Sequence, residues 1–557
     1  MPKERQPVSQ EASPVQEERE GDSTPPPARQ RRTPRKRSRP SLRAGLAVVA
    51  GRTAGALSRR FHVGGGTSVV GIVAQRVYPD IVEHLATQLE YGSVLVTGTN
   101  GKTTTSSFIS AILRDGGLRV WRNREGSNLM RGVASSLVIR AQPSGRLRRS
   151  GHAISILEID EAALPHLVQA LSARILVFTN LFRDQLDRYG EVDSGAALWR
   201  KAISLLPETT TLVLNADDPG VAFLGESFPG KVLYYGVDDL SLNLLTQTTT
   251  PQRYQILDTR SCPRCGGDFV YDARFYSHMG HYHCSNCDLQ RPQPDIRALH
   301  VMQESFDRQH MQVVTLTQQR DMLVPLPGLY NIYNALAAIT ASLALNMDWE
   351  PIVSGIEQSK PVFGRGERVQ AEGRTLRLLL AKNPTGFNEV LRTLFSQGTP
   401  RHVLFILNDN TADGRDISWI WDVDFERAIN LMPTLVVAGT RALDLALRLK
   451  YAGQPQNAMT IVPSFALRAA RAETPHSLRS QRRARQAPEA VQSPPEEEDV
   501  PSATRAYGLK KALDSALAQT PIGETLFIVP TYTGLLEIHR ELEQRGLTPH
   551  YWEGRDA

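Results

Sequence analysis

The chain has 557 residues, and its 64 lysine and arginine residues against 58 aspartate and glutamate residues give a net charge of +6. At roughly 100–200 residues per domain, this length predicts about three domains, and the hydrophobic fraction of 41% excludes a wholly disordered protein. Four cysteines are too few for the disulfide framework of a secreted protein, and no apolar run reaches the about 20 residues of a membrane-spanning helix. We therefore expect a soluble cytoplasmic protein.

The positive charge is concentrated near the N-terminus. Residues 1–43 contain 11 lysine and arginine residues against 6 acidic residues and are rich in proline, which predicts a disordered basic tail. The cluster from Arg29 to Arg43 could contact nucleic acid or an anionic membrane surface, or could serve only as a solubilising arm. The segment Leu42–Leu57 is similar to a signal sequence, but Arg52 interrupts its apolar stretch, so we do not expect export.

The elements that follow alternate between strands and helices. Ser93–Thr97 is a β-branched run that predicts a buried strand, and the helical spacing of apolar residues in Thr103–Arg114 predicts a helix that ends at Gly116. Further strands are predicted at residues 154–159, 175–179, 211–214, 403–407, 434–438 and 525–529. This alternation predicts an α/β protein with a mostly parallel sheet covered on both faces. A tract rich in Pro, Arg and Glu, residues 471–505, predicts a disordered insert in the last domain.

The segment TGTNGKTT, Thr97–Thr104, stands between the first predicted strand and the first predicted helix. Glycines at such a turn let backbone amides approach phosphate oxygens, a lysine adds positive charge, and a threonine hydroxyl can bind Mg²⁺. Val96 stands where the usual phosphate loop has its first glycine, so we expect a shortened variant that binds ATP; the alternative is an ordinary Gly-Asn turn before a capped helix. The predicted ATP-binding residues of this loop are Gly98, Thr99, Asn100, Gly101, Lys102, Thr103 and Thr104.

A carboxylate near this loop would complete a magnesium site. Glu158 stands near the end of a predicted strand, at the edge where open α/β sheets bind their ligands. We expect Glu158 and Thr103 to hold Mg²⁺; the alternative is a solvated glutamate at a strand end.

All four cysteines lie in a polar segment, residues 258–292, that interrupts the α/β pattern. They form two C-x-x-C pairs separated by 18 residues, Cys262 with Cys265 and Cys284 with Cys287. Four thiolates in a tetrahedron suit Zn²⁺ and leave no open coordination position, so the spacing predicts a structural zinc site; a redox pair or unliganded thiols are the alternatives. The histidines between the pairs are expected to pack or hydrogen-bond locally, and they are His278, His281 and His283.

Several motifs in fixed order resemble those of the Mur ligase family. They are Thr97–Thr104, Thr179–Asn180, Asn215–Pro219, Tyr330–Ala338 and Gly364–Glu367. The cysteine segment, Asn180–Glu191 and Leu407–Asp422 narrow the resemblance to the branch that forms the ligase-like subunit of lipid II isoglutaminyl synthase. The resemblance implies a central ATP-binding domain at residues 44–328, carrying a zinc ribbon at 258–292, and a C-terminal Rossmann-like α/β domain at 329–557.

The resemblance also implies a reaction and a partner. ATP would phosphorylate the α-carboxylate of D-glutamate in the lipid II stem peptide, and ammonia would convert the acyl phosphate to D-isoglutamine. Ammonia would come from glutamine on a GatD-type class I glutamine amidotransferase subunit in a heterodimer. This agrees with a chain whose cysteines are all assigned to zinc and which lacks an evident glutaminase nucleophile. Lipid II would place the work at the inner face of the plasma membrane, with at most peripheral membrane contact and no nucleic-acid partner.

Further site residues follow from the resemblance alone. Asn331 and Asn334 match the pair that contacts adenine, and Arg365 would neutralise charge on the transferred phosphoryl group. Asp416 matches an aspartate that completes a Cys-His-Asp arrangement with the partner's cysteine and histidine. From the residues alone, Asp409, Asp413 and Asp422 are equally plausible, and any of them could be only a turn or N-cap residue. Asn215 and Asp218 are expected to shape the nucleotide side; Asn334 could instead cap its helix, and Asp218 before Pro219 could form a turn.

Two departures from the general family pattern stand out. Asp184-Gln185 replaces an Asp-His pair, which removes an imidazole metal ligand, and Leu379–Pro384 replaces an Asp-Tyr-Ala-His-Asn-Pro element. The lost aspartate and histidine favour a different acceptor, such as free ammonia.

Two other functions are compatible with parts of the sequence. A stand-alone ligase of the folylpolyglutamate synthase kind would add an amino acid without a partner. A zinc-ribbon ATPase guided by the basic tail would show salt-sensitive binding to DNA or RNA. The missing Asp-His elements argue against the stand-alone ligase, and the near-neutral charge of the body argues against the nucleic-acid-binding ATPase. Both observations therefore favour the amidating subunit.

Overall fold

The structure is a computed structural model that describes residues 41–60, 67–123, 128–148, 150–171, 173–184, 192–247, 257–361, 363–395, 397–464 and 502–548. The predicted basic tail up to residue 40 lies outside the described residues, as do Gln185–Glu191 and positions 471–501 of the predicted insert. The last four positions of that insert, 502–505, belong to a helix, α15 (Ser502–Gln519).

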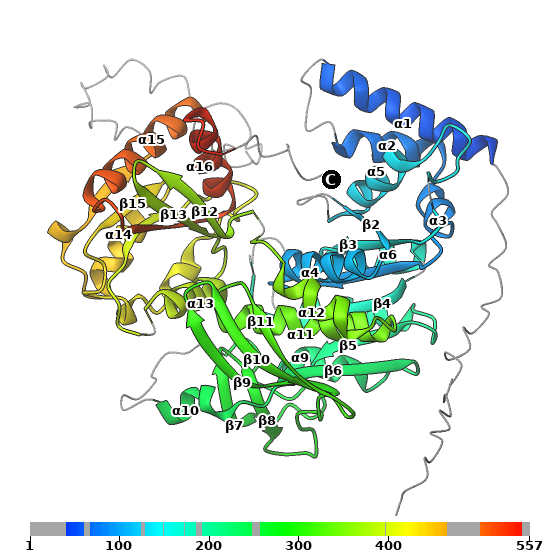
Figure 1. The fold of residues 1–557 in the computed structure, drawn as a ribbon, viewed down its shortest axis with the longest axis horizontal. Coiled ribbons are helices and arrows are strands. Elements are labelled where there is room, and N and C mark those ends of the chain that lie inside the picture. Colours follow the sequence, from blue (N-terminus) through cyan, green and yellow to red (C-terminus); the bar gives the residue numbers. More distant parts are fainter. Residues whose placement is uncertain are drawn as a thin grey trace, which may run out of the picture. The chain divides into compact units, whose positions relative to one another are not determined.

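The described chain begins with helices that precede the first sheet. They are α1 (Leu42–Arg60), α2 (Thr67–Val77) and α3 (Ile81–Ala86). Together with α5 (Met130–Arg140) they form a helical layer in which α1 and α2 both contact α5 (Figure 1). Ala44, Ala47 and Val48 of α1 are buried in this layer, and α1 begins one residue before the predicted end of the tail. Over the described residues, no helix has the length and apolar character needed to cross a membrane.

The described residues of the central part form a nine-stranded sheet in the order β11-β10-β9-β6-β5-β4-β1-β3-β2. The strands are β1 (Ser93–Thr97), β2 (Arg119–Arg122), β3 (Ala153–Glu158), β4 (Ala173–Phe178), β5 (Thr211–Asn215), β6 (Lys231–Val237), β9 (Ile296–Ser305), β10 (Arg308–Val314) and β11 (Gln319–Val324). All pairs from β2 to β9 are parallel, and β10 and β11 extend the sheet antiparallel. The predicted strands of this region are therefore confirmed within about two residues, whereas the antiparallel edge was not predicted.

Helices cover both faces of this sheet, as predicted. One face packs against α4 (Lys102–Asp115), α11 (Leu329–Ala344) and α12 (Trp349–Glu357), which lie side by side (Figure 1). The other packs against α3, α5, α6 (Leu164–Ala170) and α8 (Val192–Ser204). The core on this face of the nine-stranded sheet includes residues of α11 and α12, which follow residue 328, the predicted end of the central domain.

A two-stranded antiparallel hairpin carries the cysteine segment. It consists of β7 (Phe269–Tyr276) and β8 (Met279–Cys284). Short helices of this region and of the last domain are α9 (Pro219–Ala222), α10 (Leu244–Gln247), η1 (Glu161–Ala163), η2 (Phe223–Gly225), η3 (Leu240–Leu242), η4 (Ser418–Asp422), η5 (Phe425–Arg427) and η6 (Gln456–Ala458).

The C-terminal part forms a six-stranded sheet in the order β12-β13-β17-β14-β15-β16. The strands are β12 (Arg365–Ala371), β13 (Arg374–Leu379), β14 (His402–Ile406), β15 (Leu435–Gly439), β16 (Thr460–Pro463) and β17 (Thr525–Pro530). Only β12 pairs antiparallel, and the other pairs are parallel. Its helices are α13 (Pro384–Phe395), α14 (Ala442–Tyr451), α15 and α16 (Tyr532–Gln544), and the sheet has a core on each face. The three strands predicted here are confirmed, in a Rossmann-like parallel arrangement.

Candidate nucleotide and zinc sites

The predicted phosphate loop joins the carboxyl end of β1 to the first turn of α4. Gly98 and Gly101 have φ angles of +135° and +86°, in the region that disfavours side chains. A Cβ atom would lie 2.0 Å from Thr179 Oγ1 at Gly98 and 2.1 Å from Asn334 Oδ1 at Gly101. Both glycines are therefore required by the conformation and by the close approach of neighbouring side chains.

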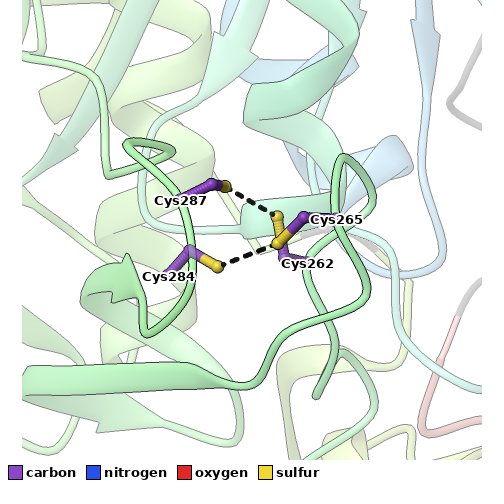
Figure 2. A group of neighbouring side chains, drawn as sticks. All are labelled: Cys262, Cys265, Cys284 and Cys287. Atoms are coloured by element: carbon purple, nitrogen blue, oxygen red, sulfur yellow. Dashed lines mark hydrogen bonds between the residues drawn. The ribbon is translucent and has the colours of Figure 1, made fainter.

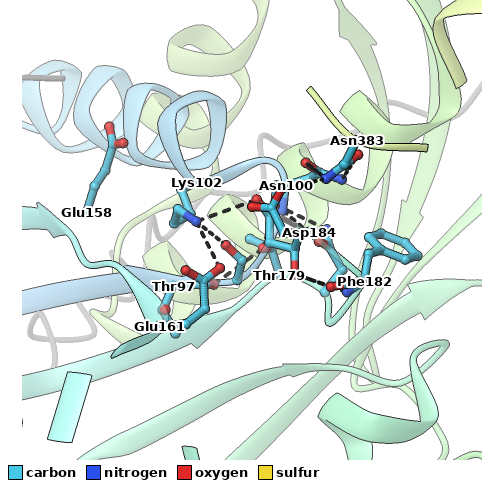
Figure 3. A network of polar contacts seen from close by, with 12 residues as sticks. Thr97, Asn100, Lys102, Glu158, Glu161, Thr179, Phe182, Asp184 and Asn383 are labelled. Atoms are coloured by element: carbon cyan, nitrogen blue, oxygen red, sulfur yellow. Dashed lines mark hydrogen bonds and ion pairs between the residues drawn. The ribbon is translucent and has the colours of Figure 1, made fainter. Parts of the chain in front are cut away.

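A second loop, which follows β4, holds the phosphate loop in place (Figure 3). The Thr179 hydroxyl donates to the carbonyl of Asn100 (2.7 Å), and the Asn100 amide donates to Asn180 Oδ1 (2.9 Å). The amide of Phe182 donates to the Thr99 hydroxyl, which in turn donates to the Phe182 carbonyl, both at 3.0 Å. These bonds hold the phosphate loop against the loop that follows β4.

Lys102 lies among carboxylates at the start of α4. Its ammonium donates to the carbonyl of Gly98 and forms a 3.0 Å ion pair with Glu161 Oε1 (Figure 3). Burial lowers the pKa of Lys102, but Glu161, Asp160 and Asp184 raise that pKa by more, so this lysine stays charged. Burial raises the pKa of Glu161 to about 7 against the opposing attraction of Lys102. Sequence reasoning missed Glu161, although its place in the acidic run after β3 was a signal.

Glu158 and Thr103, the two residues expected to hold Mg²⁺, are in hydrogen-bond contact. The Thr103 hydroxyl donates to Glu158 Oε2 at 2.8 Å, and Arg122 lies 3.3 Å from the other carboxylate oxygen. The Glu158 backbone is held by the Asn123 side chain through bonds of 3.0 and 2.9 Å. A buried carboxylate beside a threonine hydroxyl offers the oxygen ligands that Mg²⁺ prefers, so these two residues fit that ion.

A cavity of about 570 Å³ opens onto the phosphate loop. Asn334 and Arg365 line it together with the loop, and Arg365 Nη1 lies 3.5 Å from the Thr104 hydroxyl. Asn331 is placed differently, because its amide donates to the Pro327 carbonyl (2.7 Å) and its oxygen accepts from Asn334 (3.0 Å). Asn331 is thus buried behind Asn334 and orients it. The cavity lining includes Thr99, Asn100, Gly101, Lys102, Thr103, Thr104, Glu158, Asn334 and Arg365, but not Gly98 or Asn331.

Lys382, which stands where the general family pattern has histidine, contacts Asp184, the residue before Gln185. Lys382, which follows β13, forms a 2.7 Å ion pair with Asp184 after β4, and both side chains line the cavity. The neighbouring Asn383 donates to Asn100 Oδ1 at 3.1 Å. Lys382 and Asn383 therefore join the C-terminal part to Asp184 and to the phosphate loop.

Asn215 and Asp218 act as structural supports beside the phosphate loop. The side-chain nitrogen Nδ2 of Asn215 donates to the Thr179 carbonyl at 3.0 Å. Asp218 caps α9 by accepting from Gly220 and Val221, and it also accepts from the Leu181 amide at 2.7 Å. Asp218 therefore has the local structural role that was the alternative to a role at the nucleotide, and it fills this role as the N-cap of α9.

The four candidate aspartates of the 407–422 segment differ in what they contact. Asp409 pairs with Arg441 at 2.6 Å, Asp413 accepts from the Thr533 amide at 2.8 Å, and Asp422 pairs with Arg183. Burial raises the pKa of Asp413 to about 6. Asp416, by contrast, is exposed outside the cavity, and the hydrogen bond from the Ser418 amide (2.8 Å) holds its pKa below the usual value. An ionised carboxylate is therefore presented to solvent at Asp416.

The four cysteines come together as the spacing predicted (Figure 2). Their sulfur atoms all lie within 4.8 Å of one another. The amides of Gly267 and Asn286 each donate to a cysteine sulfur at 3.4 Å, which suits thiolates. The donor set therefore fits a closed, structural Zn²⁺ site. His281 bonds to the Val237 carbonyl and His283 to Asp272, so these histidines are engaged locally, as expected.

The tip of the cysteine hairpin reaches the phosphate-loop support. The rings of Tyr276 and His278 pack on Phe182 at centroid distances of 5.9 and 4.9 Å. His278 is buried, with Nε2 3.3 Å from Asp218. Burial lowers the pKa of His278, but Asp218 raises it by more. The hairpin therefore braces the segment that hydrogen-bonds Thr99.

Two proteins of known identity match most of the chain. A protein of Streptococcus pneumoniae named lipid II isoglutaminyl synthase (glutamine-hydrolyzing) subunit MurT is 32% identical over 421 residues, which cover 75% of this chain and 89% of the relative. The subunit of the same name from Staphylococcus aureus is 34% identical over 409 residues, covering 73% and 86%. The chain belongs to the MurT family. The predicted resemblance is thereby confirmed.

Domain and structure comparisons agree with membership of the MurT family. Residues 96–261 match the Mur ligase middle domain, and residues 380–479 match the MurT ligase C-terminal domain. A pseudomurein peptide ligase type C from Methanothermus fervidus superposes with a TM-score of 0.56 at 19% identity, covering 87% of this chain and 85% of the other. The Mur-ligase-like fold is confirmed.

Proposed function

We propose that this MurT-family chain is the ATP-dependent subunit that amidates the α-carboxylate of D-glutamate in the lipid II stem peptide. The substrate carboxylate oxygen attacks the γ-phosphorus of ATP and ADP leaves. Ammonia then attacks the acyl carbon, phosphate leaves, and the nitrogen loses a proton to give D-isoglutamine. The observation that carries the proposal is the cavity of about 570 Å³, which joins the phosphate loop and the Thr103–Glu158 pair to basic residues of the C-terminal part.

The chain's own residues divide the binding work. The backbone amides of the phosphate loop and the ammonium of Lys102 hold the phosphates. To reach them, Lys102 gives up its ion pair with Glu161. Arg365 lies at the same cavity wall, where it compensates charge on the transferred group. Thr103 and Glu158 would hold Mg²⁺, which would supply Lewis-acid stabilisation of the phosphate charge. Asn334, oriented by Asn331, offers its amide to the base.

The ammonia source is a GatD-type glutaminase partner that uses Asp416. An aspartate beside a catalytic histidine orients the imidazole and stabilises its charged form while a thiolate attacks. Asp416 suits this role because it is exposed, ionised and outside the cavity, whereas the other three aspartates of the segment have internal partners.

Exposed apolar residues of η4, which follows Asp416 in sequence, and of α14 supply a surface for that partner. The side chains of Trp421, Leu443, Leu447 and Tyr451 are all at least 40% exposed. Trp421 and Tyr451 contact each other with ring centroids 5.7 Å apart, and η4, which carries Trp421, begins two residues after Asp416. Exposed aromatic and leucine side chains of this kind are typical of the centre of a protein interface.

The substitution Asp416→Asn tests the proposal. We expect the purified chain with its partner to lose glutamine-dependent amidation of lipid II by at least about a hundredfold, because the partner's histidine loses its charge partner. Amidation with ammonium chloride in place of glutamine should continue, because the phosphate loop and cavity are untouched.

Asp348→Asn is the matched control. Asp348 is an exposed aspartate that precedes α12, a helix that packs against the nine-stranded sheet. Full glutamine-dependent activity in Asp416→Asn, or equal losses in both variants, would refute the role of Asp416. Absence of ATP-dependent amidation with either nitrogen source in the unaltered complex would refute the proposed reaction.

A further inference from the structure

Helix α1 buries alanine and glycine residues together with Val48, and it leaves all three of its leucines exposed. Ala44, Ala47 and Val48 are fully buried, whereas Leu42, Leu46, Val49 and Leu57 are between 46% and 90% exposed. The spacing of these four residues puts them on one face of the helix, which we call the outer stripe. An ordinary surface helix shows the opposite arrangement, with large apolar residues toward the core.

The inner face of α1 cannot exchange places with the outer stripe. A Cβ atom at Gly45 would lie 2.4 Å from the Pro143 carbonyl oxygen, and one at Gly51 would lie 2.6 Å from that of Val70. Only residues without bulk fit against these backbone segments, so rotating α1 to bury its leucines would cause severe overlap. The exposure of the outer stripe is therefore fixed by the packing of the helical layer.

The sequence of α1 and of the segment that precedes it carries charge of one sign only. Residues 29–60, which include all of α1, contain 11 lysine and arginine residues and no aspartate or glutamate. A helix with an exposed apolar stripe and flanking basic residues binds in the interface of anionic bilayers, through apolar insertion and attraction to lipid headgroups. Since no described helix can cross a membrane, α1 would lie along the surface.

We infer that α1 is a docking helix for the surface of an anionic phospholipid bilayer, with the outer stripe inserted among the headgroups. This inference goes beyond the proposed amidation. It rests on the proposed function only for the reason why docking is useful, which is that a lipid-linked acceptor lies at the membrane surface. The docking itself requires neither ATP nor the acceptor.

Sedimentation of the full-length chain with vesicles tests the inference. We expect binding to vesicles of phosphatidylcholine mixed with phosphatidylglycerol, weakened by salt, and little binding to phosphatidylcholine alone. Leu46→Gln/Leu57→Gln should lower partitioning onto the anionic vesicles by about tenfold, because buried apolar area is lost. The matched control is Leu316→Gln/Ile522→Gln, which changes two other highly exposed apolar residues and should bind as the unaltered chain does.

Insertion can also be observed without removing an apolar residue. In Leu46→Trp, tryptophan fluorescence should shift to the blue on anionic vesicles, because the indole leaves water. Binding that persists in Leu46→Gln/Leu57→Gln, or no blue shift in Leu46→Trp, would overturn the inference, as would equal binding to neutral vesicles. Self-association that depends on Leu46 and Leu57 would instead assign the stripe to a second copy and also overturn it.

Amidation of a soluble muropeptide, measured on the same preparations, separates the two proposals. If that activity is present and vesicle binding fails, only the docking falls. If vesicle binding is present and amidation fails, only the proposed function falls.

Discussion

Replacing Gly101 by alanine separates two costs at the phosphate loop. Gly117, just after α4, has nearly the same φ angle, +80° against +86°, so alanine pays a similar conformational penalty of about 1 kcal/mol at either position. At Gly117 a Cβ atom would meet nothing within 4 Å, whereas at Gly101 it would lie 2.1 Å from Asn334 Oδ1. The difference between the two variants therefore reports the contact with Asn334.

The size of that difference follows from what holds Asn334. Its amide donates to Asn331 at 3.0 Å, and its oxygen accepts from the Thr105 hydroxyl at 3.3 Å, both in buried surroundings. Moving Asn334 out of the way breaks or weakens two hydrogen bonds of about 1 kcal/mol each. We expect Gly101→Ala to destabilise the protein by about 2 kcal/mol more than Gly117→Ala.

The assay combines thermal unfolding with calorimetric titration of ADP. Gly117→Ala should keep the affinity for ADP, and Gly101→Ala should lose at least about tenfold, because phosphate-binding amides shift with the loop. The double variant Gly101→Ala/Asn334→Ala should be more stable than the sum of its single effects predicts, since the overlap is gone. Equal unfolding temperatures and ADP affinities for Gly101→Ala and Gly117→Ala would refute this reasoning.

Three further predictions concern charge and metal. Burial raises the pKa of Glu161 from 4.5 to about 7, so its contribution to stability is complete below the unfolded pKa and is lost as pH rises through about 7. Between about pH 5 and 8, the free energy of unfolding of the unaltered chain should fall by up to about 3 kcal/mol relative to that of Glu161→Gln. A difference between the two chains in denaturant unfolding that does not change with pH would contradict this. Lys382→Met should destabilise by about 1–2 kcal/mol by leaving Asp184 unpaired, and Asp184→Asn in the same chain should recover most of it in thermal unfolding; simple additivity would exclude the coupling. Cys265→Ser should lower the zinc content measured by elemental mass spectrometry and the unfolding temperature, whereas an unaltered chain purified without zinc would reject the site.

The phosphate loop and the zinc cluster could be predicted because their signals are local. In Thr97–Thr104 and in the two C-x-x-C pairs, neighbours in sequence are neighbours in space, and each residue type has a strong chemical preference. The same holds for β1, whose bounds are those predicted from its β-branched run. Short, buried parallel strands can be predicted from composition, because they are nearly continuous runs of apolar residues.

Other features depend on contacts between distant segments and could not be read from a local pattern. Lys382 meets Asp184 across 198 positions of sequence, and Glu161 joins the site only because β3 lies beside β1. The placement of α11 with the nine-stranded sheet likewise follows from its packing against α4. A sequence pattern gives the apolar character of such a helix but not the core to which it belongs.

Transfer of oxygen-18 from substrate to phosphate tests the central claim most directly. Lipid II labelled in the D-glutamate α-carboxylate is incubated with the chain, its partner, ATP and glutamine. If the carboxylate is activated as an acyl phosphate, one labelled oxygen leaves with each phosphate, and the lipid loses about one mass unit, beyond the label, for each ADP formed. Unlabelled phosphate accompanying amide formation would contradict the account.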